Sequence, residues 1–137
     1  MSEAKPARAP RQRRARGAAE SLGSIVLGFE CVIVFLGGLV VYGLQALPAG
    51  IAPWWGIVGG AVVAVLMLLT AGLLRHRWAI WVGWALQVLV ALSAFLVPTM
   101  LIVAVIFGGM WAYATIKGAS LDRRNAQLRA AQTDNGD

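Results

Sequence analysis

Residues 22–47 read LGSIVLGFECVIVFLGGLVVYGLQAL, an apolar run that contains one acid, Glu30. At a rise of about 1.5 Å per residue, the segment 25–45 alone makes a helix of roughly 31 Å, about the thickness of the hydrocarbon core of a bilayer. A core helix of a soluble domain rarely needs so long an apolar run. We therefore predict a membrane-spanning helix, with Glu30 inside it at a depth where an ionised side chain is costly.

The composition of the chain supports the same class of protein. Of its 137 residues, 59% are hydrophobic and only 13% are charged, and the mean hydropathy is +0.73. A soluble domain of this size has too much surface to hide so many apolar side chains. We predict a single all-α integral membrane domain, a four-helix bundle.

Breaker residues and loop lengths define the other three spans. Two prolines and a glycine in 48–53 separate the first span from the second, at about 54–74, and residues 75–77 form a tight loop. The apolar stretch 78–116 would measure almost 60 Å as one helix, so it must fold back at Pro98. The predicted spans are about 22–47, 54–74, 78–96 and 99–116, within a membrane domain of residues 21–117.

The two tails carry most of the charge. Residues 1–20 form a basic tail that we expect to be disordered, because it has few large apolar residues, and residues 118–137 form a polar tail. In the four-span topology all twelve Lys and Arg residues lie on one side, which the positive-inside rule makes cytoplasmic. The net charge of +6 therefore indicates orientation and not nucleic-acid binding. The basic cluster is also a candidate contact for anionic lipid head groups; its residues are Arg11, Arg13, Arg14 and Arg16.

Small residues recur every four positions in the second and fourth spans. The spacing is the one that lets two membrane helices approach closely, and it predicts packing inside the bundle or against another membrane helix. The residues are Gly56, Gly60 and Ala64 in the second span, and Ala104, Gly108 and Ala112 in the fourth.

Glu30 and Gln87 form a candidate intramembrane polar pair. Counted inward from the cytoplasmic ends of the first and third spans, both lie at a similar depth, roughly 10 Å for Glu30. We expect a hydrogen bond between them near Gly108 and Gly109, which would leave room for both side chains. One interpretation is structural, a bond that joins helices. The other is a desolvated carboxyl that exchanges protons or binds a cation. An acid at this depth can also lean toward Arg75 or Arg77.

Catalytic chemistry has no support in the sequence. The bundle contains no second carboxyl for paired acid–base work, and a lone His76 and a lone Cys31 make neither a metal site nor a thiol–imidazole pair. No glycine-rich phosphate loop lies between a strand and a helix. We expect a protein that is not an enzyme and that uses no cofactor or metal.

Several short motifs resemble those of a known family. They are SL at 21–22, VLGFE at 26–30, VFL at 34–36, GWALQ at 83–87, PTM at 98–100, IF at 106–107 and Trp111. In order and spacing they are similar to a small actinobacterial four-helix membrane family of unknown function, over about residues 21–122. The resemblance implies a multi-pass protein of the bacterial plasma membrane and offers no activity to carry over.

The sequence leaves two hypotheses for function. We expect a non-enzymatic helix-packing or accessory module that lies in the lipid bilayer and packs with itself or with a larger membrane protein. The alternative is a small proton- or cation-coupled transporter that uses Glu30.

Overall fold

The computed structural model describes residues 16–136 of the chain. Over these residues it is helical without strands, with α1 at Ala18–Gly43, α2 at Trp55–Leu73, α3 at Arg77–Leu92, a short 3-10 helix η1 at Ser93–Phe95, and α4 at Met100–Asn135. Four helices, α3 being counted through η1, are long and apolar enough to cross a membrane. The predicted all-α four-helix architecture is confirmed, and the chain is a multi-pass membrane protein by the length and composition of its helices.

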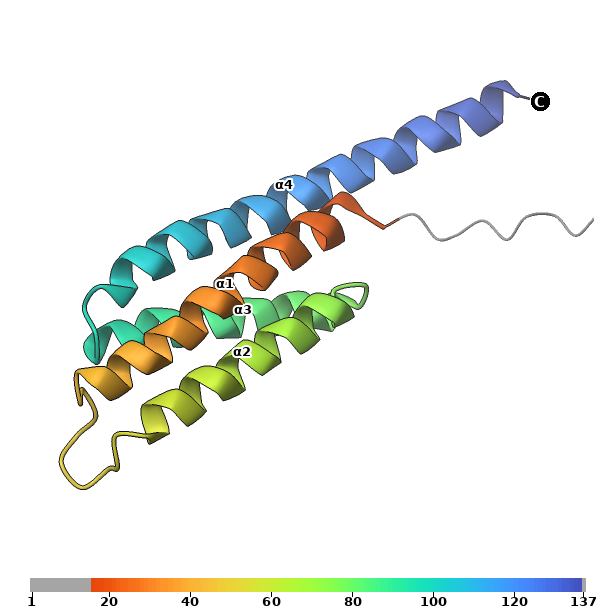
Figure 1. Cartoon of the computed structure of the whole chain (residues 1–137). Helices are drawn as coiled ribbons and strands as arrows, with labels where there is room; N and C mark the ends of the chain where they lie inside the picture. The colour runs from red at the N-terminus through yellow and green to blue at the C-terminus, as the bar shows by residue number, and fades with distance from the viewer. Residues whose placement is uncertain (1–15, 137) are drawn as a thin grey trace, which may run out of the picture.

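The helices form one bundle in which α1 is central (Figure 1). It packs against α2 along most of its length and against α4 on another side, while α3 contacts both α2 and α4. The start of α1 and the loop between α2 and α3 lie at one end, here called the terminal end, where α4 continues beyond the bundle. The segment between α1 and α2 and the turn between α3 and α4 lie at the other, the loop end.

The boundaries of α1 differ from the predicted span at 22–47. The helix ends at Gly43, because Gln45 takes a left-handed φ of 50° and Ala46 N–H bonds back to the carbonyl of Val41. It begins at Ala18, so the last residues of the predicted disordered tail are helical, which corrects that expectation for this part. Residues 1–15 of the predicted tail lie outside the described residues.

The chain reverses direction between α3 and α4 around Pro98. The last turn of α3 tightens into η1, and the Pro98 carbonyl then accepts the N–H of Leu101 as α4 starts. Beyond the predicted span end at 116, α4 continues as helix to Asn135. Its sequence there is rich in Ala, Gln, Arg and Leu, which favour helix, and it contains no proline. The predicted polar tail at 118–137 is therefore helical as far as Asn135.

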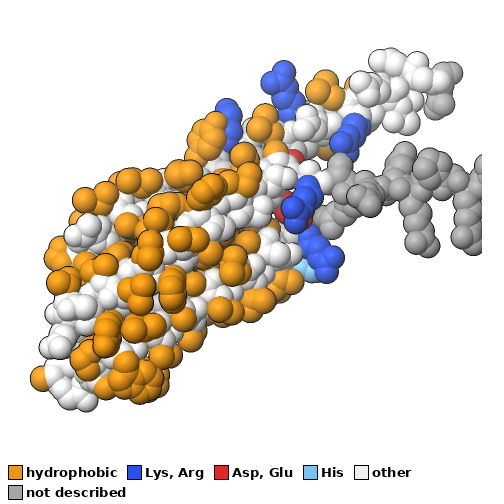
Figure 2. Space-filling model, in the orientation of Figure 1, with side chains coloured by type: hydrophobic (Ala, Val, Ile, Leu, Met, Phe, Trp, Pro, Cys, Tyr) orange, Lys and Arg blue, Asp and Glu red, His pale blue; other side chains and the backbone are white. Residues whose placement is uncertain are grey.

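The core of the bundle is small and its outer surface is apolar. The largest fully buried side chains are those of Trp111, Leu27, Met67 and Glu30. Figure 2 shows hydrophobic side chains covering the bundle, whereas the Lys and Arg side chains of the described residues gather toward the terminal end and along the extension of α4. An apolar belt of this extent suits contact with lipid and not with water.

Candidate functional site

Glu30 lies on the buried face of α1 and is 0% exposed. It is three residues from Leu27, which is also fully buried, and seven from Gly37, so helical spacing carries all three to the same side. Gln87 lies on the buried face of α3 with Gly83 and is 6% exposed. The fold thus removes both polar side chains from the lipid-facing surface.

The structure brings Glu30 and Gln87 together. Gln87 Nε2 donates a hydrogen bond to Glu30 Oε2 at 2.5 Å, between residues 57 positions apart in the chain. Glu30 makes no salt bridge within residues 16–136, where Arg16–Glu20 is the only ion pair. Arg75 lies at the terminal end and its Nε donates to His76. The alternative in which Glu30 leans toward an arginine of the 75–77 loop is therefore not the arrangement of this structure.

Gly108 on α4 gives the pair its space. A Cβ atom at Gly108 would lie 3.7 Å from Gln87 Oε1, so this oxygen faces a position without a side chain. Its neighbour Gly109 is exposed and faces nothing within 4 Å. The room predicted at this point of the fourth span comes from Gly108 alone.

Trp111 completes the interior beside the pair. Its ring is 0% exposed; a Cβ at Gly83 on α3 would collide with it, and one at Gly23 on α1 would lie 3.2 Å from it. Sequence reasoning did not select this residue as part of the site. A signal was present, since a tryptophan one turn from Gly108 lies well inside the span and not at its rim.

Three buried side-chain atoms have no hydrogen-bond partner in the described part of the chain. They are Glu30 Oε1, Gln87 Oε1 and Trp111 Nε1. Buried polar atoms are usually paired, so three orphans on three neighbouring helices mark this interior as unusual. No group of three or more His, Cys, Asp or Glu residues within 16–136 is placed to hold a metal ion. Cys31, one residue from Glu30, donates its thiol hydrogen to the Gly28 carbonyl.

The small residues of α2 lie against α1. A Cβ at Gly60 would be 2.8 Å from Gly38 Cα, and one at Gly56 would be 3.1 Å from the Gly38 carbonyl oxygen. Ala64 is half-buried and packs against the core. The glycine spacing of the second span thus belongs to a backbone-to-backbone contact inside this bundle.

The small residues of α4 behave differently. Ala104, Gly108 and Ala112 are half-buried, and a Cβ at Gly108 would not approach another helix as closely as one at Gly60 would. Among the glycines of α4, the closest contact with another helix is at Gly118, where a Cβ would collide with the backbone of Ala19 on α1. Gly118 lies beyond the predicted fourth span, so the repeat at 104–112 did not include it.

Asp122 fixes the terminal end of α1 to α4. Its two carboxylate oxygens accept hydrogen bonds from the backbone N–H groups of Ala18 at 2.7 Å and Ala19 at 3.3 Å. These groups are among the donors that a helix leaves unpaired in its first turn. Asp122 therefore caps α1 from a helix more than 100 positions away in the chain, a role that no local sequence pattern could show.

The basic cluster of the N-terminal tail lies largely outside the structure. Arg11, Arg13 and Arg14 are not among the described residues. Arg16 forms an ion pair with Glu20 at 3.5 Å, with 63% of the Arg16 side chain exposed. An exposed pair of this kind contributes little stability.

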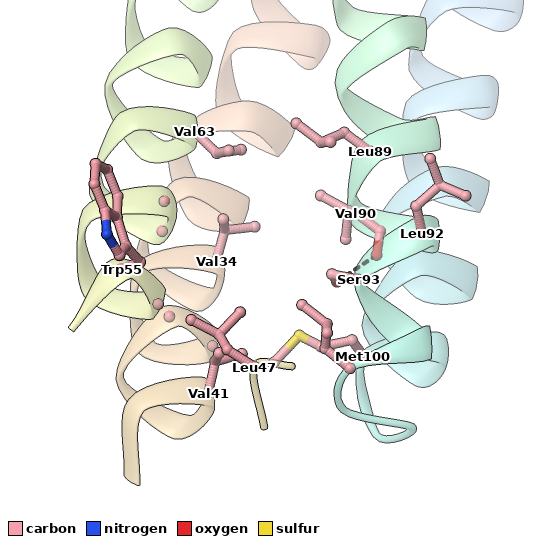
Figure 3. A pocket seen from close by; sticks show the side chains of 16 residues that line it. Val34, Val41, Leu47, Trp55, Val63, Leu89, Val90, Leu92, Ser93 and Met100 are labelled. Carbon is pink, nitrogen blue, oxygen red and sulfur yellow. Dashed lines mark hydrogen bonds between the residues drawn. The ribbon is translucent and has the colours of Figure 1, made fainter. Parts of the chain in front are cut away.

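An apolar cavity of about 340 Å³ lies toward the loop end, with α1 and α2 on one side and α3 on the other. Figure 3 shows Val34 and Val63 on one wall and Val90 on the other, with Met100 near the turn. The one hydroxyl in its lining is that of Ser93, which donates to the Val90 carbonyl. The cavity thus offers mainly hydrocarbon contact, and Glu30 is not one of its lining residues.

Comparison with known proteins gives one match. Residues 21–127 match a family described as protein of unknown function (DUF4233). The chain belongs to this family. The matched region contains Glu30, Gln87, Trp111 and Asp122, so the buried pair and the Asp122 cap both lie within the DUF4233 domain. No curated protein and no solved structure matches the chain.

Proposed function

We propose that this DUF4233 protein is a non-enzymatic helix-packing module in which the Glu30–Gln87 bond joins α1 to α3. The observation that carries the proposal is that bond, which links two almost fully buried side chains in an interior that is largely apolar. Interhelical hydrogen bonds in membrane proteins contribute about 0.6 to 2 kcal/mol. That is enough to select one packing of short apolar helices over others.

A small proton- or cation-coupled transporter is the second candidate. The specific observation in its favour is the same acid, because an ionisable side chain inside a span often marks a path for ions or protons. Against it, Glu30 is 0% exposed, and the cavity at the loop end has an apolar lining to which Glu30 does not contribute. Transport would require an opening of the bundle at α1.

Two substitutions at Glu30 separate these functions. Glu30→Gln keeps a group that can both donate to and accept from Gln87, so we expect thermal stability in detergent close to that of the wild type. Glu30→Leu leaves the Gln87 amide unpaired, and we expect a loss of about 1–3 kcal/mol. Glu20→Gln, which removes an acid at the terminal end, is the matched control.

The transporter makes a different prediction for the same variants. If the protein is a transporter, both Glu30 variants should remain folded but show no proton flux across the membrane of reconstituted vesicles, because neither Gln nor Leu exchanges a proton. Equal flux in wild type and variants, with the stability order above, supports the packing module. Equal stability of all three proteins would contradict it.

The proposed setting is a bacterial plasma membrane with both termini in the cytoplasm. Its support is the gathering of basic side chains at the terminal end and along α4 (Figure 2), together with the positive-inside rule. Those cations are suited to anionic lipid head groups, and the apolar outer surface suits a second copy or a larger membrane protein.

Reporter fusions test this orientation. Fusions after Gly50 should report the outside, and fusions after Arg77 or Asp137 the cytoplasm. A cytoplasmic signal at Gly50 would overturn the orientation.

A further inference from the structure

The Glu30–Gln87 pair contains two buried oxygens that receive no hydrogen bond. Gln87 Nε2 already donates to Glu30 Oε2, but Glu30 Oε1 and Gln87 Oε1 have no partner. Both side chains are more than nine-tenths buried. Two acceptors without a donor are costly in an apolar interior. One further hydrogen between the two oxygens would remove this cost.

No other described side chain supplies that hydrogen. Trp111 Nε1 is the remaining unpartnered buried atom, and it bonds to neither oxygen. No residue of α2 is titratable. The only charged residue of α3 is Arg77, the first residue of that helix, and the first charged residue along α4 is Lys117. On α1, Cys31 gives its thiol hydrogen to the backbone.

The tyrosines do not supply it either. Tyr42 on α1 is 47% exposed and Tyr113 on α4 is 65% exposed, so both hydroxyls belong to the outer surface. A negative charge on Glu30 would therefore face no cation from any of the helices packed around it. The arrangement suits a neutral acid.

We propose that Glu30 keeps its proton on Oε1 and donates it to Gln87 Oε1, so that the two side chains form a closed, uncharged acid–amide pair with two hydrogen bonds. An amide and a carboxylic acid are complementary in this way, since each offers one donor beside one acceptor. The proton is then the ligand of this interior site. It satisfies both orphan oxygens without a counter-ion, and its loss removes one of the two bonds between α1 and α3.

This inference rests on the proposed packing role and specifies its chemistry. Glutamate labelled with ¹³C at the carboxyl carbon gives three signals, from Glu3, Glu20 and Glu30, and Glu30→Gln identifies the third by its absence. The measurement is the NMR shift of that signal for the full chain in lipid nanodiscs from about pH 5 to about pH 9, above the ~4.3 at which a solvated Glu titrates. We expect the Glu30 signal to stay at the protonated position through neutral pH, while the other two are ionised.

A second measurement tests the pairing itself. In Gln87→Leu the buried acid loses its partner, so we expect its infrared carbonyl stretch to move to higher frequency, and this band is absent from Glu30→Gln. An unchanged band in Gln87→Leu would overturn the closed pair. An ionised Glu30 at neutral pH would also overturn it, and this result leaves the packing role standing if Glu30→Leu remains less stable than Glu30→Gln. Proton flux that depends on Glu30 would instead remove the packing role.

Discussion

Two contacts of α1 with other helices both depend on glycine, but the interactions that stabilise them differ. Toward the loop end, Gly38 lies against Gly60 of α2, with backbone touching backbone and no polar side chain between them. At the terminal end, Gly118 of α4 lies closer still to Ala19, and there the Asp122 carboxylate also accepts the N–H groups of the first turn of α1. Glycine allows the approach in both places. Only the second contact adds hydrogen bonds between a side chain and the backbone.

The difference follows from chain connection and surroundings. Helices α1 and α2 are consecutive and joined by a short segment, so packing in an apolar layer is enough to align them. The start of α1 and the extension of α4 are far apart in sequence, and the first-turn N–H groups of α1 need partners. A carboxylate that fills this need fixes the position of one helix end against the other.

The largest effect should come from breaking the apolar contact. In Gly60→Ala the new Cβ would lie 2.8 Å from Gly38 Cα, and neither backbone can give way as a flexible side chain would. We expect a loss of about 3 kcal/mol, the upper part of the range for overpacking, measured as unfolding free energy in mixed micelles. Gly59→Ala is the control, since a Cβ there meets nothing within 4 Å. Equal losses for the two variants would show that α1 and α2 are not held by this contact.

A smaller effect should come from removing the Asp122 cap at the terminal end. Asp122→Ala leaves two N–H groups of α1 without their acceptor, and a lost cap costs about 1 kcal/mol. We expect faster amide hydrogen exchange confined to Ala18, Ala19 and the residues just after them. Asp134→Ala, a change of equal charge further along α4, serves as the control. Unchanged exchange at Ala18 would mean that the carboxylate does not cap α1.

The smallest effect should come from Gly108, the glycine of the small-residue repeat predicted for the fourth span. In Gly108→Ala the new Cβ would lie 3.7 Å from Gln87 Oε1, an ordinary van der Waals contact. We expect a change in stability below about 0.5 kcal/mol, within the range of neutral substitutions. Gly108→Leu should be harmful, because the larger side chain would displace the Gln87 amide. A large loss for Gly108→Ala would show that α4 lies closer to α3 than in this structure.

Much of the architecture is present in local patterns. The length of residues 22–47, the breakers at 48–53 and the excess length of 78–116 are enough to predict four spans, because each depends on the thickness of the bilayer and on proline geometry. The end of α1 was wrong by four residues, since an apolar run does not reveal that Gln45 turns into the left-handed region. The helical extension of α4 was also missed, because its polarity suggested a tail.

The candidate site divides in the same way. Depth along the helix was enough to select Glu30 and Gln87, since an acid and an amide among apolar residues are conspicuous and a helix rises by a fixed amount per residue. Trp111 was not selected, because its burial depends on Gly23 and Gly83 of two other helices.

By itself, the sequence determined that this is a four-span helical membrane protein with one acid in its interior, because hydropathy, helix length and charge distribution act along the chain. Only the tertiary structure decided that Gly38 packs against Gly60, that Gly118 packs against Ala19, and that Asp122 caps α1. Small residues permit close contact with any neighbour, and a carboxylate accepts from any free N–H group. Which neighbour each one meets depends on the packing of all four helices at once.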